Sequence, residues 1–335
     1  MSTLPEVNKR LLEVQDLQVD IEVDAGVIHA VRGVGFRMDR GEALGIVGES
    51  ACGKSLTAVS LLGLTRDIPG ARVGGHVFFA PQKGEADRVV DVVRAGRADL
   101  RRIRGNEIGI VFQDPISSLN PVFTVGYQIM EPLMLHRQMT RAEAAEEAKR
   151  LLRMVGIAEA DQRASHFPHQ LSGGMRQRVM IAIALSCQPS LLIADEPTTA
   201  LDVTVQAQIL SLLLQLRDEL GTAIILITHD LAIVAGTCER VLVMYAGRIV
   251  EATDVHTFFT APKHPYSRAL IESIPRADRK KDLIPIAGQP PDLLIAPAGC
   301  AFAERCPRAD GVCLETDPKL TEMGGSLAAC HHPWV

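Results

Sequence analysis

The feature that most constrains this chain is a glycine-rich loop set between an apolar run and a helical stretch. Residues 48–55 match the pattern G-x-x-x-x-G-K-[ST], which binds the phosphates of a nucleotide. The apolar residues 44–47 predict a short buried strand before the loop, and residues 54–64 have the composition of a helix after it. Because the motif requires this order of strand, loop and helix, the sequence predicts a phosphate-binding loop in an α/β fold.

Each position of the loop has a task in such a site. Glycines let backbone amides converge on phosphate oxygens without side-chain bulk. Lys54 is expected to reach the β- and γ-phosphates, and Ser55 to place its hydroxyl on Mg²⁺. Ala51 stands where a glycine is expected, which the loop tolerates if the φ angle of Ala51 is negative. The residues predicted to contact ATP are Gly48, Glu49, Ser50, Ala51, Cys52, Gly53, Lys54, Ser55 and Leu56.

A second apolar run, at residues 191–194, ends in the carboxylates Asp195 and Glu196. An ATPase with such a loop needs a metal-holding aspartate and a water-activating group. Asp195 is therefore the predicted Mg²⁺ ligand, and Glu196 the predicted general base. A pair of acidic residues after a strand can also be a solvated turn, so the assignment depends on the neighbouring motifs.

Other short apolar runs indicate further strands of the same core. They lie at residues 108–112, 223–227 and 241–244, and each has the length of a buried strand. Between residues 113 and 172, alanine, glutamate and arginine recur at helical spacing. We expect a mostly parallel α/β core with an inserted helical subdomain at about residues 114–175.

Residues 171–175 place Ser172, Gly173 and Gly174 at the start of a helix. Between the loop and the two carboxylates, this stretch resembles the signature sequence of ABC-type ATPases. The resemblance implies that the signature of one subunit closes over the γ-phosphate held by the loop of another. Two glycines at a helix N-terminus suit that role because their amides donate to developing negative charge.

Three more residues match elements of the ABC family in chain order. Gln113 resembles the glutamine-loop residue, which implies a catalytic position and contact with Mg²⁺. Asp202 lies in a stretch that resembles the dimer-contact loop and is expected near the nucleotide. His229 resembles the switch histidine and is expected to be catalytic. The implied fold is a P-loop ABC-type nucleotide-binding domain with the helical insertion.

Several stretches resemble the ATPase subunits of bacterial dipeptide and oligopeptide importers, over nearly the whole chain. They are Q-D-P-I-S-S-L-N-P at 113–121, residues 182–189, D-E-P-T-T-A-L-D-V-T at 195–204 and H-P-Y at 264–266. The resemblance implies that this chain is the first of two homologous ATPase subunits. Their partners would be two membrane permeases and, through them, an extracytoplasmic solute-binding protein. Nickel, glutathione or another small solute as cargo, and a soluble ABC ATPase without a permease, remain alternatives.

Composition limits the classes of function. The 335 residues carry a formal net charge of −5, which gives no general attraction to nucleic acid. No run approaches eighteen apolar residues, and residues 1–10 do not read as a signal peptide. We therefore expect a soluble, peripheral subunit at the cytoplasmic face of the inner (plasma) membrane. The lack of an internal repeat argues against two fused cassettes.

From about residue 258 the chain becomes rich in proline, which predicts a domain boundary. The expected division is an ABC ATPase domain at residues 10–257 and a small, irregular, cysteine-containing C-terminal domain at residues 258–335.

The tail contains Cys300, Cys306, Cys313 and Cys330, separated by 5, 6 and 16 residues. In a chain without an export signal, such a group is better explained by metal binding than by disulfides. The spacing lacks the paired C-x₂₋₄-C knuckles of structural zinc. Four thiolates can hold a [4Fe–4S] cluster, and the resemblance to peptide importers points the same way. Zinc and unmetallated buried thiols remain open alternatives.

Overall fold

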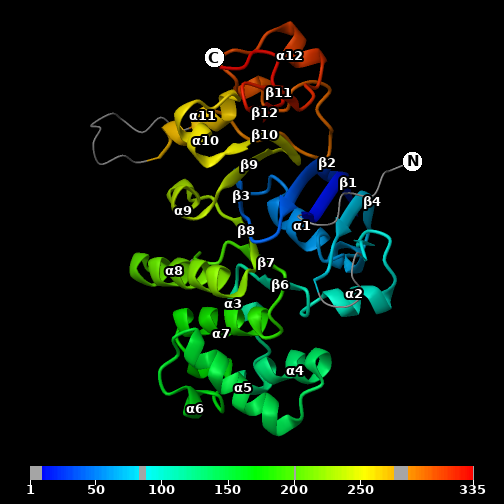
Figure 1. The fold of residues 1–335 in the computed structure, drawn as a ribbon. Helices are drawn as coiled ribbons and strands as arrows, with labels where there is room; N and C mark the ends of the chain where they lie inside the picture. The colour runs from blue at the N-terminus through cyan, green and yellow to red at the C-terminus, as the bar shows by residue number, and fades with distance from the viewer. Residues whose placement is uncertain (1–9, 83–87, 200, 275–285, 335) are drawn as a thin grey trace. The chain divides into compact units, whose positions relative to one another are not determined.

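The computed structural model describes residues 10–82, 88–199, 201–274 and 286–334. Its contacts divide the chain into two compact units. The first is built mainly from Phe79–Ile227, and the second from Glu13–Arg37, Ala43–Phe78 and Thr228–Val335. Figure 1 labels most of the helices and strands of both units.

The core of the first unit is a parallel sheet in the strand order β8-β7-β6. β6 spans Ile108–Val111, β7 spans Leu191–Asp195 and β8 spans Ala223–Ile227. β7 and β8 are buried along their whole length, as expected for parallel strands covered on both faces. The predicted strands are confirmed to within one residue at each end.

The helices of the first unit include a separate group formed by α4, α5 and α7, which pack on one another and appear in green in Figure 1. α5 begins with a capping box between Thr140 and Glu143, which fixes its first turn. The remaining elements of this unit, in chain order, are β5 Val90–Asp91, α2 Arg97–Ile103, α3 Pro115–Ser118, α4 Val125–Arg137, α5 Arg141–Met154, α6 Ala160–Arg163, η2 Pro168–Gln170, α7 Gly173–Leu185 and α8 Val203–Leu220. The helical insertion predicted at about 114–175 thus falls on α3 to α6 and the start of α7.

The second unit contains two groups of strands. β3 (Ala43–Val47) pairs in parallel with β9 (Arg240–Tyr245), whose other edge pairs in antiparallel fashion with β10 (Arg248–Asp254). β12 (Ser326–Ala328) and β11 (Thr321–Met323) extend this sheet beyond β10. The second group has the order β2-β1-β4 and consists of β1 Arg10–Val23, β2 Gly26–Asp39 and β4 Ala71–Phe79, none of which was predicted.

The helices of the second unit are short. They are α1 Lys54–Ser60, η1 Leu64–Asp67, α9 Leu231–Thr237, α10 Val255–Thr260, α11 Pro265–Glu272, η3 Ala303–Arg305 and α12 Gly311–Glu315. The helix predicted over 54–64 ends four residues early, at Ser60. A turn follows it, in which Gly63 adopts a left-handed φ of 68° that does not continue a helix.

An aromatic cluster joins the C-terminal stretch to the strands of this unit. The ring centroids of Tyr245 and Tyr266 lie 4.6 Å apart, and each lies 5.3 Å from that of Phe302. Phe258 and Val47 belong to the same buried core. The residues after 258 therefore share a core with β3 and β9, and the predicted boundary between residues 257 and 258 stays a prediction.

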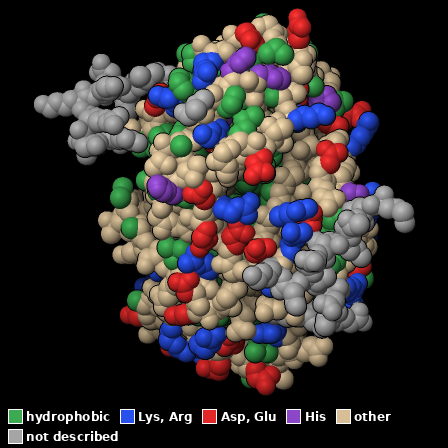
Figure 2. Space-filling model, turned by 45° about the horizontal axis from the view of Figure 1, so that its top comes forward, with side chains coloured by type: hydrophobic (Ala, Val, Ile, Leu, Met, Phe, Trp, Pro, Cys, Tyr) green, Lys and Arg blue, Asp and Glu red, His purple; other side chains and the backbone are tan. Residues whose placement is uncertain are grey.

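The visible surface carries both signs of charge. Acidic and basic side chains are intermingled over the face drawn in Figure 2. Among the described residues, no helix combines the length and the apolar character needed to cross a bilayer.

Candidate functional site

The glycine-rich loop connects β3 to α1, as predicted. Gly48 and Gly53 adopt positive φ angles of 153° and 96°. A Cβ atom on Gly48 would lie 2.2 Å from the carbonyl oxygen of Met244, and one on Gly53 would lie 2.4 Å from that of Ala30. Only glycine fits these two positions, because both the backbone angle and the space exclude a side chain.

Lys54 is buried, with 5% of its surface exposed, at the first position of α1. Its Nζ donates hydrogen bonds to the carbonyl oxygens of Gly48, at 2.9 Å, and Glu49, at 2.8 Å. The ammonium group therefore lies within the curve of the loop. Burial raises the pKa of the neighbouring Cys52 thiol, and Lys54 opposes that rise. The loop thus holds its one cation where phosphate oxygens are expected.

The rest of the loop is open. Ser50, Ala51 and Ser55 are exposed, whereas Leu56 is half-buried. The condition under which the loop was expected to tolerate Ala51, a negative φ, is not met, because the structure gives Ala51 a left-handed φ of 61°. An alanine in this region brings its Cβ close to the following carbonyl oxygen, at a cost of about 1–2 kcal/mol.

Replacing Ala51 by glycine is therefore expected to raise the free energy of unfolding by about 0.5–1 kcal/mol, the relief of strain less the added freedom of the unfolded chain. Chemical denaturation measures the change. As a control, Ala142→Gly in the exposed first turn of α5 is expected to lower stability by about 0.5–1 kcal/mol. A loss of stability in Ala51→Gly would mean that the loop bears no strain at this position.

The two carboxylates lie in the first unit, at the carboxyl end of β7. Asp195 is 5% exposed. Glu196 has a left-handed φ of 45°, and its backbone N–H donates to the carbonyl of Ile227 at 2.9 Å. Gln113 Nε2 and Thr199 Oγ1 each donate to Glu196 Oε2 at 2.9 Å. The structure thus brings Gln113 and Glu196 together, and it adds Thr199, which sequence reasoning missed.

The signature stretch is also in the first unit. Ser172 caps α7, and its Oγ accepts a hydrogen bond from the backbone N–H of Met175 at 3.3 Å. A Cβ atom on Gly174 would lie 2.9 Å from Val205 of α8, so α7 approaches α8 closely here, whereas a Cβ on Gly173 would meet its nearest side chain only at 4.0 Å. Asp202 caps α8 by accepting from the Val205 N–H at 2.9 Å. The signature and the loop after β7 are therefore neighbours.

His229 belongs to the second unit and is exposed, two residues after the end of β8. The next residue, Asp230, donates its backbone N–H to Thr228 Oγ1 at 3.0 Å and caps α9 through its carboxylate. The loop and His229 thus lie in one unit, and Gln113 and Glu196 in the other.

The four tail cysteines lie close enough to influence one another. Burial raises the pKa of Cys330 to about 11, and the thiols of Cys300, Cys306 and Cys313 add to that rise. The backbone N–H of Cys300 donates to the carbonyl of Cys313 at 2.8 Å. A metal ion needs ligand atoms that lie close together. Among the described residues, the group whose possible ligand atoms all lie within 4.8 Å of one another is not the four cysteines.

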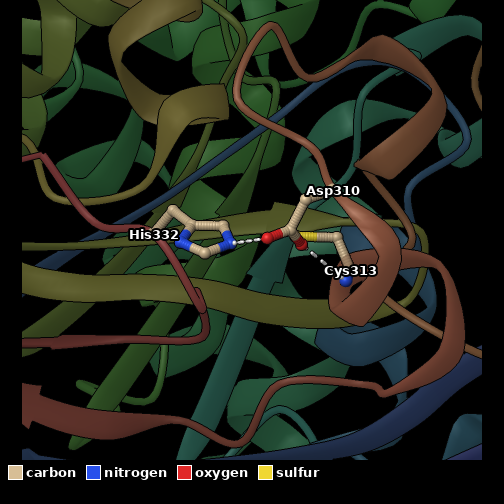
Figure 3. Close-up of side chains that lie close together, drawn as sticks. All are labelled: Asp310, Cys313 and His332. Atoms are coloured by element: carbon tan, nitrogen blue, oxygen red, sulfur yellow. Dashed lines mark hydrogen bonds and ion pairs between the residues drawn. The ribbon is translucent and has the colours of Figure 1, made fainter.

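That group consists of Asp310, Cys313 and His332, drawn in Figure 3. His332 Nε2 lies 2.8 Å from Asp310 Oδ2, and Asp310 Oδ1 accepts from the Cys313 backbone N–H at 3.3 Å. It combines one thiol with a carboxylate and an imidazole, unlike the four thiolates that hold a [4Fe–4S] cluster. The hydrogen bonds that Asp310 makes explain the arrangement as a cap of α12.

A glycine loop that encloses a lysine, and a buried strand that ends in two carboxylates, define the class of P-loop nucleotide-hydrolysing proteins. Comparison with known proteins narrows the class. Residues 31–199 match the family described as "ABC transporter", and residues 250–313 match "Oligopeptide/dipeptide transporter, C-terminal region". The chain belongs to the ABC transporter family of ATP-binding proteins and is an ATPase.

Similar proteins cover nearly the whole chain. A "Probable peptide ABC transporter ATP-binding protein y4tR" of Sinorhizobium fredii is 51% identical over 96% of this chain and 94% of its own length. An "Oligopeptide transport ATP-binding protein OppD" of Salmonella typhimurium is 48% identical over 98% and 96%. Among solved structures, a dimeric ATP-binding cassette, MJ0796, in a post-hydrolysis state with ADP and Pi has a TM-score of 0.62 and 28% identity. It covers 73% of this chain and 99% of its own. The predicted α/β cassette fold is confirmed.

These findings correct one prediction. The relatives are named plainly as ATP-binding proteins, and neither family description mentions iron. Together with the mixed ligand group at Asp310, this overturns the assignment of a [4Fe–4S] cluster to Cys300, Cys306, Cys313 and Cys330. Spacing misled the prediction because four thiols can gather in a small fold through burial alone. Burial raises the pKa values of Cys300, Cys306 and Cys330, which favours their protonated form.

Proposed function

We propose that this chain hydrolyses ATP to drive the import of dipeptides or oligopeptides through a membrane permease. The observation that carries the proposal is the match to peptide-transport ATP-binding proteins, which extends beyond the cassette into residues 250–313. A cassette match alone would leave the cargo open, because the cassette is shared by transporters of many solutes. The additional C-terminal match favours peptides over nickel, glutathione or another small solute.

In the proposed site, the loop residues 48–55 hold the phosphates of ATP. Lys54 is buried within the loop and binds the β- and γ-phosphates, while Ser55 is exposed at its end. Ser55, Gln113 and Asp195 offer hydroxyl, amide and carboxylate oxygens, the hard ligands that Mg²⁺ prefers. When bound, Mg²⁺ neutralises charge that develops on the phosphate oxygens.

Glu196 is the proposed general base. Its carboxylate accepts the proton of a water molecule as the water oxygen attacks the γ-phosphorus, and the bond to the leaving ADP oxygen breaks. The hydrogen bonds from Gln113 and Thr199 orient the carboxylate, which supports this role. His229 is the proposed switch residue that senses the γ-phosphate.

We propose that the working unit is a head-to-tail pair of ATPases, this chain being the first of two homologous subunits. Ser172, Gly173, Gly174 and Asp202 would contact the nucleotide held by the partner's loop. The solved cassette with a similar fold is itself described as dimeric, which supports the pairing. ATP binding would close the pair, and hydrolysis would reopen it.

The permease contact is proposed at the stretch after Gln113. Here Ile116, Val122 and Phe123 are 67%, 70% and 44% exposed, which is unusual for large apolar side chains. Two permeases would place the chain at the cytoplasmic face of the inner membrane, with a solute-binding protein on the opposite side.

Co-purification and competition test the function. The tagged chain is expected to bring down two multi-spanning permeases and a second ATPase from detergent extracts. In cells that depend on this chain for uptake of a labelled tripeptide, unlabelled peptides are expected to compete and nickel or glutathione to have no effect. Recovery without permeases would favour a soluble ABC ATPase, and competition by nickel or glutathione alone would overturn the peptide cargo.

A further inference from the structure

Glu49, the second residue of the phosphate-binding loop, is fixed at three points. Its carboxylate accepts two hydrogen bonds from Arg305, with Nη1 to Oε2 at 2.6 Å and Nη2 to Oε1 at 2.9 Å. Its backbone N–H donates to the Tyr266 hydroxyl at 2.8 Å. Its carbonyl oxygen accepts from Lys54 Nζ at 2.8 Å. All four residues belong to the second unit.

Arg305 itself is held rigidly. Only 4% of its side chain is exposed. Nη1 also donates to the Tyr245 hydroxyl at 3.1 Å, and Nε donates to the carbonyl of Ala287 at 2.8 Å. The guanidinium lies 5.7 Å from the ring centre of Tyr245 and 5.8 Å from that of Phe302. The bond to Glu49 is the largest cause of the raised pKa of Arg305. A bidentate arginine–carboxylate pair fixes the orientation of the carboxylate as well as neutralising its charge.

These contacts form a path from the C-terminal stretch to the phosphate-binding lysine. Arg305 and Tyr266 determine where Glu49 lies, and the Glu49 carbonyl is one of two that hold the Lys54 ammonium. Tyr266 and Arg305 both lie outside the stretch that matches the ABC transporter family, at residues 31–199. Both anchors lie within residues 250–313, which match the oligopeptide/dipeptide transporter C-terminal region.

We infer that Arg305 is a positioning residue for nucleotide binding, which acts through Glu49 to hold the loop and Lys54, with Tyr266 as a second anchor. The inference rests on the proposed role of residues 48–55 as the phosphate site. Because the loop contacts phosphates both before and during the reaction, its loosening weakens binding of ATP and of the transition state alike. The effect then falls on KM and leaves kcat nearly unchanged.

The test replaces Arg305 by methionine in the assembled transporter. The KM for ATP is expected to rise about tenfold, with kcat within about twofold of wild type. The Kd of a fluorescent ATP analogue, measured on the purified full chain, is expected to rise by a similar factor. Arg305→Lys keeps the positive charge but cannot make the bidentate hydrogen bond. Its KM for ATP is therefore expected to lie between those of wild type and Arg305→Met.

Arg308→Met is the matched control. Arg308 also lies over an aromatic ring, 4.5 Å from the centre of Trp334, and donates to the carbonyl of Pro333 at 3.2 Å. Its KM for ATP is expected to stay at the wild-type value. A lower melting temperature with unchanged KM in Arg305→Met would reduce Arg305 to a structural role and overturn the inference.

Glu49→Gln provides a second, independent variant, because it keeps the backbone bonds to Tyr266 and Lys54. If the two side chains act as one unit, the double variant with Arg305→Met raises KM no further than either single change. Additive effects would contradict the inference. Lys54→Ala, measured beside them, separates the two proposals. Unchanged nucleotide affinity in Lys54→Ala would refute the loop assignment. Weakened nucleotide affinity in Lys54→Ala, together with a wild-type KM in Arg305→Met, would refute only the role of Arg305.

Discussion

Replacing Glu196 by glutamine is expected to slow ATP turnover by about 10²- to 10⁴-fold, the usual contribution of a general base. Glutamine keeps the shape of the side chain, and its amide oxygen still accepts from Gln113 and Thr199, which both donate to Glu196 Oε2 in the structure. It has no carboxylate to take the proton of the attacking water. Nucleotide binding is therefore retained, and the paired cassettes are expected to accumulate with ATP bound.

Two measurements on the Glu196→Gln protein check this expectation: phosphate release under saturating ATP, and the fraction of nucleotide-bound dimer. Glu146→Gln is the matched control, because Glu146 is exposed on α5 and pairs with Lys149 on the same helix. The control is expected to hydrolyse ATP at the wild-type rate. Undiminished hydrolysis in Glu196→Gln would exclude Glu196 as the base.

Replacing Lys54 by alanine is expected to weaken ATP binding by about 10- to 150-fold, the value of one hydrogen bond to a charged group. The ammonium group is buried in the loop and is already held by two carbonyl oxygens. Its removal leaves the phosphate-binding loop without its positive charge. The Kd for ATP therefore rises, whether or not the chemical step is also slowed.

Equilibrium binding of a fluorescent ATP analogue gives the Kd directly, and circular dichroism confirms that the variant is folded. Lys149→Ala is the control, since Lys149 makes a helix-surface ion pair with Glu146. Its Kd for ATP is expected to equal that of wild type. Unchanged affinity in Lys54→Ala would mean that the phosphates bind elsewhere.

Local pattern was sufficient to predict much of the fold. The runs that became β3, β6, β7, β8 and β9 are short and almost entirely apolar. Apolar runs of this length, rich in β-branched residues, are typical of buried parallel strands. The loop was equally clear, because Gly48, Gly53 and Lys54 combine an unusual spacing with a strand before it and a helix after it. β1 was missed although Leu17, Val19, Ile21 and Val23 alternate with polar residues, which is the pattern of a half-buried strand.

The remaining features depend on contacts between distant residues. Glu49 and Arg305 are 256 positions apart, and nothing in the residues near either one indicates the pair. The φ of Ala51 follows from the loop as a whole rather than from alanine, which prefers negative φ. For the tail cysteines, the sequence pattern predicted a site that is not supported. Their number and spacing suggested an iron–sulfur cluster, but neither the relatives nor the mixed group around Asp310 supports one.

Peptide uptake into proteoliposomes tests the central claim most directly. The purified transporter is reconstituted with its solute-binding protein, ATP is supplied on the side of this chain, and accumulation of a labelled oligopeptide is followed over time. The account predicts ATP-dependent uptake with wild-type protein and almost none with Glu196→Gln. Uptake that continues at the wild-type rate with Glu196→Gln, or ATP hydrolysis by the wild type without any peptide uptake, would contradict it.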